Sequence, residues 1–220
     1  MTSVLPRVLP ARAIRSMVRQ FGHPRGLPGR LVGWIMAHRR SNVARNRWVV
    51  AVLDVRPTER VLEIGFGPGI ALAELARRVT RGQVYGVDHS AVMVAQASRR
   101  NAAAIAAHRV RLTQAPVDRL PSFTEPLDTV FAVNNMAFWP DPQARLRELR
   151  GLLRPGGRIA LVSQPRSPGA NRETTKRVAQ ELQDALTRAG FTWQRTETLA
   201  LDPPVACVIA TNTATNPAPQ

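Results

Sequence analysis

The chain has 220 residues, enough for one domain with a full hydrophobic core and too few for two of ordinary size. Its hydrophobic fraction of 44% is ordinary for a soluble globular protein, and no apolar run approaches the roughly 20 residues of a membrane-spanning helix. The single cysteine, Cys207, excludes an intrachain disulfide and favours a reducing compartment. We therefore expect a cytoplasmic protein in which Cys207 is a small buried core residue.

The net charge of +16 is concentrated at the start of the chain, where residues 1–50 hold ten arginines and no acidic residue. Such a segment attracts phosphates, acidic small molecules or a membrane surface, although a solvated basic surface needs no partner. Pro6, Pro10 and the loop over 22–29 interrupt it. We predict a basic N-terminal helical extension, residues 1–48, that lies against the main domain as a lid. Apolar spacing predicts helices over 13–21, 31–38 and 41–53.

From Thr58 onward the pattern alternates between strands and helices. Buried or alternating apolar runs predict strands over 60–66, 83–89, 109–114, 127–135, 157–164, 191–201 and 204–211. Helical spacing predicts helices over 68–79, 90–107, 141–153 and 171–189. Ser90 caps the second of these, and the proline and glycines of RPGG end the third. This order predicts a parallel sheet with helices on both faces and an antiparallel hairpin at one end, formed by residues 49–212, followed by a disordered tail, 213–220.

The strongest functional signal is the segment EIGFGPG, residues 63–69, which follows the first predicted strand and opens its helix. Its three glycines allow tight backbone geometry and let main-chain N–H groups approach a ligand, and the helix N-terminus adds partial positive charge. A dinucleotide-binding fingerprint has its third glycine three positions after the second, where this chain has Ile70. The spacing and the acid at Glu63 therefore argue against pyrophosphate binding and against a dehydrogenase.

A carboxylate, Asp88, ends the second predicted strand. At that place it can accept hydrogen bonds from both hydroxyls of a ribose, although a cap on the following helix is the simpler role. His89 follows it, and an ordinary surface histidine explains this residue as well as a side chain against a purine base does.

These segments together resemble the motif series of class I S-adenosylmethionine-dependent methyltransferases, and especially the ubiquinone/menaquinone-biosynthesis-like small-molecule branch. The resemblance is carried by EIGFGPG, VDHSAVM, LDTVFAVNN and LRELRGLLRPGGRIALV and covers residues 58–163. It implies an α/β, Rossmann-like three-layer sandwich whose seven strands have the order 3-2-1-4-5-7-6, one of them antiparallel. It also implies an enzyme that uses S-adenosylmethionine as its cofactor and methyl donor.

The resemblance implies roles for single residues in binding that cofactor. The residues after the first strand would line its methionine part with Glu63 supporting the turn, Asp88 would hold the ribose, and Asn134 would approach the reaction centre. Pro116 stands where the family often has an acid for the adenine amino group, so a backbone carbonyl or Asp118 must replace it. The expected cofactor-binding residues are Glu63, Gly65, Phe66, Gly67, Gly69, Asp88, His89, Met93, Val117 and Asn134.

The acceptor site is the part that the sequence defines least. Methyl transfer mainly needs alignment of the acceptor with the methyl group. A general base is needed only if the acceptor atom is protonated at working pH. His38 is a candidate for this base if the N-terminal helices cover the site. The segment after the fifth predicted strand is too short to cover the acceptor site, so the N-terminal extension should cover it instead. We expect this basic cover to admit a small, partly apolar acceptor, which can be anionic. No acidic cluster near the fourth strand indicates a metal. The residues expected at this site are Trp34, His38, Arg39, Arg40, Asn42 and Asn46, with Asn135, Phe138 and Trp139 after the fourth strand.

Three other functions stay open. The charge allows an RNA substrate, with steeply salt-dependent binding, although the Asn-Pro-Pro-aromatic signature of many nucleic-acid methyltransferases is absent and we do not expect a nucleic-acid partner. The chain is also compatible with a non-enzymatic cofactor-binding protein that contacts a membrane through its basic N-terminus. A dehydrogenase is the third alternative. A homodimer is compatible with the sequence as well.

Overall fold

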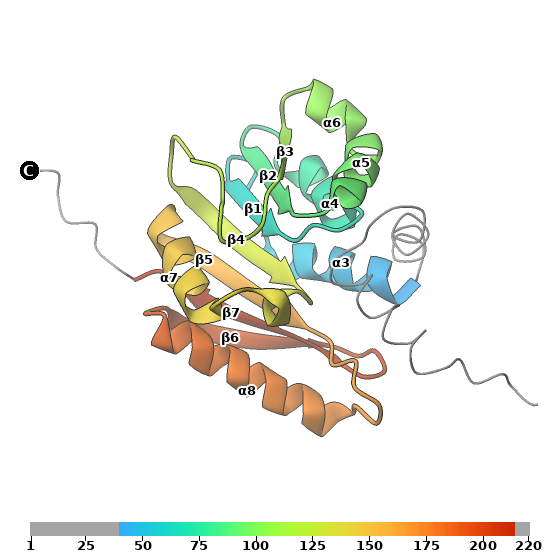
Figure 1. Cartoon of the computed structure of the whole chain (residues 1–220), viewed down its shortest axis with the longest axis vertical. Coiled ribbons are helices and arrows are strands. Elements are labelled where there is room, and N and C mark those ends of the chain that lie inside the picture. The colour runs from blue at the N-terminus through green and yellow to red at the C-terminus, as the bar shows by residue number, and fades with distance from the viewer. Residues whose placement is uncertain (1–39, 214–220) are drawn as a thin grey trace, which may run out of the picture.

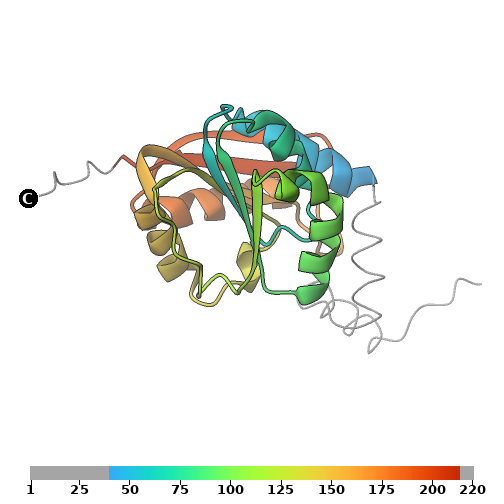
Figure 2. The ribbon, with the colours of Figure 1, turned by 90° about the horizontal axis from the view of Figure 1, so that it is seen from above.

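The computed structural model describes residues 40–213, which form a seven-stranded sheet between two layers of helices (Figures 1 and 2). The sheet has the order β3-β2-β1-β4-β5-β7-β6, in which β7 alone runs antiparallel to its neighbours, so the predicted topology is confirmed. The strands are β1 Arg60–Ile64, β2 Gln83–Asp88, β3 Val110–Gln114, β4 Leu127–Val133, β5 Leu153–Ser163, β6 Thr192–Leu199 and β7 Val205–Thr211.

Each face of the sheet buries its own apolar cluster beneath a helical layer. One face is covered by α3, α4, α5 and α6, and the other by α7 and α8. The central strands read as continuous apolar runs because both of their faces are buried. The helices are α3 Arg40–Leu53, α4 Ile70–Arg78, α5 Ala91–Arg100, α6 Ala102–Ala106, α7 Pro142–Leu152 and α8 Arg172–Arg188, with a 3₁₀ turn, η1, at Met136–Phe138.

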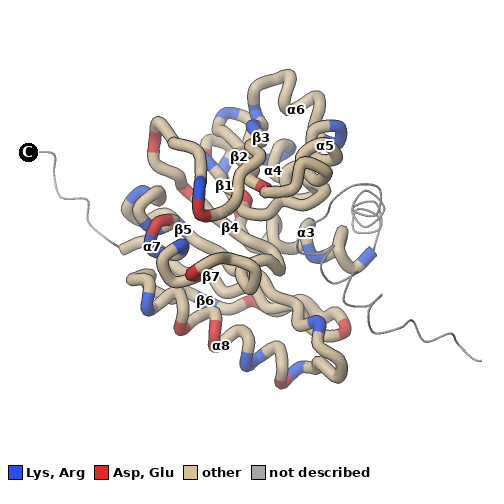
Figure 3. Tube along the Cα trace, in the orientation of Figure 1, with Lys and Arg blue, Asp and Glu red and all other residues tan. Residues whose placement is uncertain are grey.

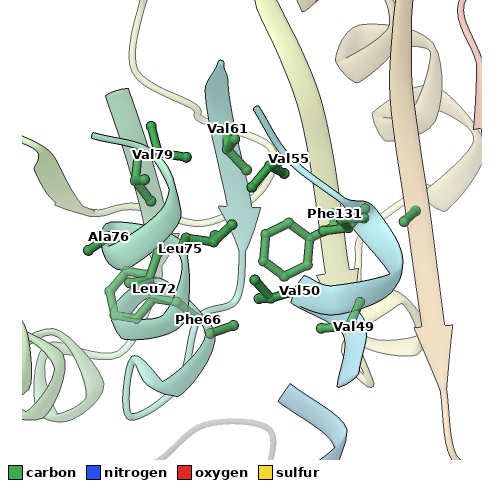
Figure 4. Close-up of a cluster of buried hydrophobic side chains, with 14 of the residues drawn as sticks. Val49, Val50, Val55, Val61, Phe66, Leu72, Leu75, Ala76, Val79 and Phe131 are labelled. Atoms are coloured by element: carbon green, nitrogen blue, oxygen red, sulfur yellow. The ribbon is translucent and has the colours of Figure 1, made fainter. Parts of the chain in front are cut away.

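The helix α3 carries an apolar and a polar patch on the same side. Val49, Val50 and Leu53 are at most 1% exposed and pack with α4 and with Phe131 of β4 (Figure 4). Near the start of the helix the buried positions are polar instead, which places amide and guanidinium groups at the end of the sheet. The predicted boundary between residues 48 and 49 falls inside this continuous helix.

Two predicted elements differ from those observed. The helix expected over 90–107 is broken at Asn101, whose side-chain Nδ2 donates to the carbonyl oxygens of Ala97 (2.9 Å) and Gly69 (3.2 Å). The segment RPGG was expected to end α7, but α7 ends before it at Leu152 and the segment belongs to β5, where the register with β4 shifts. The Ser90 cap is confirmed, since its side chain accepts from the backbone N–H of Met93.

The predicted burial of Cys207 is confirmed. The residue lies in β7 with no exposed surface, and burial raises the pKa of its thiol to about 12.

No helix among residues 40–213 has both the length and the apolar character needed to cross a bilayer. Basic and acidic residues are interspersed along α8, where Lys176 pairs with Glu173 at 2.9 Å (Figure 3). The predicted helices over 13–21 and 31–38 and most of the predicted tail lie outside the described residues.

Candidate functional site

Residues 65–69 connect the end of β1 to the start of α4 and are called the glycine turn below. Gly65, Gly67 and Gly69 have φ angles of 67°, 53° and 74°, a region that residues with a side chain rarely adopt. The backbone N–H of Gly65 donates to the carbonyl of Val87 in β2 at 2.7 Å, and that of Gly69 donates to the carbonyl of Phe66 at 3.0 Å. The glycines are therefore required by the conformation of the turn itself.

Side chains from two other elements brace the glycine turn. Asn135, just after β4, donates through Nδ2 to the carbonyl oxygens of Ile64 and Gly65. A Cβ atom on Gly65 would lie 2.2 Å from that Nδ2 atom, so the position holds only a glycine while Asn135 stays in place. From the other side, Arg100 at the end of α5 donates to the carbonyl of Pro68 at 2.7 Å. The turn is thus fixed before any ligand arrives.

The carboxylate of Asp88 closes the turn from the end of β2. Its Oδ2 accepts from the backbone N–H of Gly67 and its Oδ1 accepts from that of Ser90, each at 2.9 Å. Because a carboxylate oxygen accepts two hydrogen bonds, each oxygen retains capacity for a ligand hydroxyl. Burial raises the pKa of Asp88. The hydrogen bonds from Ser90 and Gly67 and the charge of His89 lower this pKa, but burial outweighs them and the net pKa is raised. Nδ1 of His89 lies 3.8 Å from Oδ1 of Asp88. Asp88 therefore links the glycine turn to Ser90, the residue that caps α5.

A second acid, Glu63, is buried beneath the same turn. Its side chain is 1% exposed, and its Oε2 atom has no hydrogen-bond partner among residues 40–213. Burial, followed by the charge of Asp88, raises the pKa of Glu63 well above its ordinary value. When both Glu63 and Asp88 are ionised they repel one another, so a positive charge at the glycine turn favours their ionised forms.

The carboxyl ends of β4 and β5 carry a row of amide side chains beside the turn. Asn134, with a φ of 55°, accepts through Oδ1 from the backbone N–H of Gln164 at 2.7 Å, and its own N–H donates to Val162 at 2.8 Å. Asn135 accepts through Oδ1 from the indole N–H of Trp139 at 3.1 Å. These bonds hold the two asparagines at the edge where the sheet opens.

A buried arginine on α3 reaches the same edge. Arg45 is 4% exposed and donates to Oε1 of Gln164 at 2.7 Å and to Oδ1 of Asn42. Arg166, in the loop after β5, donates to that same Gln164 oxygen at 3.1 Å. Asn42 and Asn46 were predicted at this site from the sequence. Arg45, Gln164 and Arg166 were not. The available signal was the buried helix face 42, 45, 46, 49 and 53, which is polar at one end and apolar at the other.

Several predicted site residues lie in the hydrophobic core. Phe66, Met93 and Val117 are at most 9% exposed, so direct contact between their side chains and a cofactor stays a prediction. Trp139 is 7% exposed and packs beneath α7, whereas Phe138 is 55% exposed on η1. Arg40 lies at the start of α3 and is exposed. The expected acceptor-site residues Trp34, His38 and Arg39 lie outside the described residues.

Comparison with known proteins agrees with this geometry. Residues 61–157 match the family model described as a methyltransferase domain. The chain is similar to the uncharacterized methyltransferase YdaC of Bacillus subtilis, with 31% identity over 161 residues, covering 73% of this chain and 86% of YdaC. It is also similar to the trans-aconitate 2-methyltransferase of an Azoarcus species, with 35% identity over 131 residues, covering 60% of this chain and 48% of that protein.

Solved structures share the fold at low sequence identity. A SAM-dependent methyltransferase from Aquifex aeolicus superposes with a TM-score of 0.63 at 19% identity, covering 89% of this chain and 97% of its own. At this identity the likeness establishes the fold alone.

Proposed function

Because this chain belongs to the methyltransferase domain family and is a methyltransferase, we propose that it binds its cofactor, S-adenosylmethionine, at the glycine turn and methylates a small acceptor at the carboxyl edge of β4 and β5. The observation that carries this assignment is the pair of buried acids, Glu63 and Asp88, around a turn built from glycines.

The residues of the turn fit this cofactor in both shape and charge. Gly65, Gly67 and Gly69 place no side chain over the backbone, which leaves main-chain groups accessible to a ligand. A ligand with a sulfonium and an ammonium group stabilises the ionised forms of Glu63 and Asp88, whereas the pyrophosphate of a dinucleotide disfavours them further. The remaining acceptor capacity of Asp88 suits ribose hydroxyls. The charge of the site therefore favours a sulfonium nucleoside over a nicotinamide dinucleotide.

The chain's own residues have positioning roles in this reaction. When bound, S-adenosylmethionine supplies a methyl group that its sulfonium already activates. Asn134, Asn135 and Gln164 are amides, which neither release nor take up a proton at neutral pH, so they orient the reactants without acid–base chemistry. Such a site suits an acceptor atom that carries no proton at working pH, because no general base is then needed.

We assign the acceptor to the class of small, partly apolar anions. The exposed ring of Phe138 next to Asn135 supplies apolar surface, and the guanidinium groups of Arg45 and Arg166 supply positive charge. The Azoarcus relative is named for trans-aconitate, a tricarboxylate, which supports an anionic acceptor. Membership of the quinone-biosynthesis branch stays a prediction.

Replacing the proposed ribose-binding carboxylate tests the cofactor site. In the Asp88→Asn protein one charged acceptor is lost, so we expect the affinity for S-adenosylhomocysteine to fall about 10- to 100-fold by titration calorimetry, the range for hydrogen bonds to a charged group. Asp184→Asn, on the exposed side of α8, is the matched control and should bind as the unmodified protein does. Undiminished binding by Asp88→Asn, or preferential binding of NAD, would contradict the assignment.

The acceptor class is tested by turnover. The full chain is incubated with methyl-labelled S-adenosylmethionine and a panel of small carboxylates, among them trans-aconitate, alongside their neutral esters. We expect label in at least one acid and none in its ester. Labelling of neutral acceptors only would refute the anionic class while leaving methyl transfer intact.

A further inference from the structure

We propose that Glu63 is protonated in the cofactor-free protein and releases its proton to solvent when S-adenosylmethionine binds at the glycine turn. The O–H bond of the carboxyl group breaks, the carboxylate stays buried beneath the turn, and the buffer takes up the proton. The proposal rests on the proposed function, which places the cofactor at the turn. It adds that Glu63 couples cofactor binding to the pH of the solution.

Glu63 lies inside the protein, two positions before Gly65 in the glycine turn. Val61, on the same face of β1, packs in the apolar cluster beneath α3 and α4, so Glu63 faces that helical layer as well (Figure 4). Glu63 is 1% exposed, and its Oε2 atom has no hydrogen-bond partner among residues 40–213. An ionised carboxylate at such a place lacks both water and donors, which costs far more than burying the neutral acid. The cofactor-free site therefore favours the protonated form.

The two acids near the turn differ in how their charges are stabilised. The carboxylate of Asp88 accepts from the backbone N–H groups of Gly67 and Ser90, each at 2.9 Å, and such bonds favour the ionised form. No donor among residues 40–213 reaches Oε2 of Glu63. When two acids interact and donors reach one of them, the other holds its proton more tightly. Glu63 is therefore the acid that keeps a proton before the cofactor binds.

Glu63 also responds to charge at the glycine turn. Burial and then the charge of Asp88 raise the pKa of Glu63 well above its ordinary value. Oδ2 of Asp88 is bonded to Gly67, so a charge held at the turn acts on Glu63 through the protein interior. A positive charge there acts with the opposite sign and lowers the pKa of Glu63. S-adenosylmethionine carries a sulfonium and an ammonium group against a single carboxylate, so its binding favours release of the proton.

The other charged groups on the elements around Glu63 have partners of their own. These are Arg45 of α3 with Gln164, Glu74 of α4 with Arg77, Arg100 of α5 with the carbonyl of Pro68, and Asp128 at the start of β4 with the backbone N–H of Arg60. Among the charged groups, Asp88 is the one that shifts the pKa of Glu63. His89, whose Nδ1 lies 3.8 Å from Oδ1 of Asp88, is a second titratable group near the turn, so the test has to distinguish it from Glu63.

A purely structural role for Glu63 is the competing explanation. An acid that only fills the space beneath the turn keeps its proton whether or not the cofactor is bound. Binding would then exchange no proton with the buffer, and the affinity would not depend on the titration of Glu63. The number of protons released on binding therefore separates the two roles, whereas stability alone does not.

The test is titration calorimetry of the full chain with S-adenosylmethionine in phosphate and in imidazole buffer, at several pH values between about 5 and 8. The change of the binding enthalpy with the ionisation enthalpy of the buffer gives the number of protons released. We expect up to about one proton per cofactor, and an affinity that rises by at most about tenfold per pH unit until the cofactor-free pKa of Glu63 is passed. Methylthioadenosine, a nucleoside with neither cationic group, should bind without proton release.

Two variants assign the proton to its residue. Glu63→Gln should bind S-adenosylmethionine without releasing a proton and with an affinity that no longer rises with pH. Glu173→Gln is the matched control, because it makes the same change in an exposed ion pair on α8, and it should release as many protons as the unmodified protein.

Each result has a distinct meaning. Binding of S-adenosylmethionine by the unmodified protein without proton release would overturn this proposal and leave the proposed function standing, whereas absence of binding would contradict the proposed function itself. Proton release that persists in Glu63→Gln would come from another group, such as His89, and would refute the role of Glu63. If Glu63→Gln does not fold or bind, the two ligands decide on the unmodified protein, since equal proton release with methylthioadenosine would also overturn the proposal.

Discussion

Glu63 is the residue whose environment conflicts most with its chemistry. An acid that is 1% exposed, with one oxygen lacking a hydrogen-bond partner among residues 40–213, destabilises the folded chain whenever it is ionised. Asp88 adds like charge to that environment. A cationic ligand bound near the two acids, as we propose for the glycine turn, would stabilise their ionised forms.

The pH dependence of stability reports the state of Glu63. In the unfolded chain this carboxyl group titrates near its ordinary pKa of 4.5, whereas in the folded chain its pKa is raised by burial and by Asp88. The folded state therefore binds more protons above pH 4.5, and stability falls as the pH rises from there to the folded pKa. Glu63→Gln removes this loss, so its unfolding free energy in urea should exceed that of the unmodified protein by a margin that is small at about pH 4 and grows as the pH rises toward the folded pKa.

Glu74 provides a control of opposite sign. Burial tends to raise its pKa, but hydrogen bonds and charges from Arg77 and Arg47 outweigh this, and the net pKa is lowered. Its ionised form therefore stabilises the folded state above the unfolded pKa, and this contribution is lost as the pH falls through the folded pKa. Glu74→Gln should be destabilising at pH 7 and lose that effect in acid. Parallel slopes for the two variants would contradict the assignment of Glu63.

At the scale of elements, the glycine turn depends on the elements around it as much as on its own sequence. The turn could be predicted from the sequence because positive φ angles and a strand–helix junction are local properties. The hydrogen bonds from Asn135 could not be predicted, because they depend on how β4 pairs with β1. The break of α5 at Asn101 was missed for the same reason, since the side chain that interrupts the helix bonds to Gly69, 32 residues earlier.

Adding one methyl group to the turn tests this dependence. Gly65→Ala places a Cβ 2.2 Å from Nδ2 of Asn135 at a φ of 67°, so either Asn135 or the turn must move. We expect at least about a tenfold loss of S-adenosylhomocysteine affinity and a destabilisation of about 1–3 kcal/mol, as for other strained positions. Calorimetry and urea unfolding measure the two effects.

Gly151 is the matched position for this test. It lies in α7, and a Cβ there would meet nothing within 4 Å. Gly151→Ala should leave ligand affinity unchanged and stabilise the protein by about 0.5–1 kcal/mol, because alanine has the higher helix propensity. Normal ligand binding by Gly65→Ala would indicate that the turn is not the cofactor site.

For the molecule as a whole, α3 is part of the domain core. Val49, Val50 and Leu53 join the cluster shared with α4 and β4, and the carbonyl of Leu53 accepts from Arg158 of β5 at 2.9 Å. The helices and strands could be predicted because each rests on local periodicity, and the strand order because the resemblance to class I methyltransferases implies it. The contact between Arg45 and Gln164 joins residues 119 positions apart, and no local pattern links them.

Truncating the anchor of α3 tests its place in the core. Leu53 is 1% exposed, so Leu53→Ala should lower the free energy of unfolding by about 2–5 kcal/mol. Unfolding followed by circular dichroism and by tryptophan fluorescence, to which Trp48 on α3 contributes, should remain a single coincident transition. Arg47→Ala, in an exposed ion pair with Glu74, should cost at most about 1 kcal/mol. Separate transitions for the two signals would show that α3 unfolds independently.

The placement of β7 sets the order in which the sheet is completed during synthesis. β7 lies between β5 and β6 although it leaves the ribosome after both, so β6 has no neighbour in the sheet until residues 205–211 have emerged. Until then β5 presents an open apolar edge to the cell, a state in which chains are prone to aggregate. A nascent chain stalled before Val205 should therefore depend on chaperones, whereas one released a few residues after Thr211 should not.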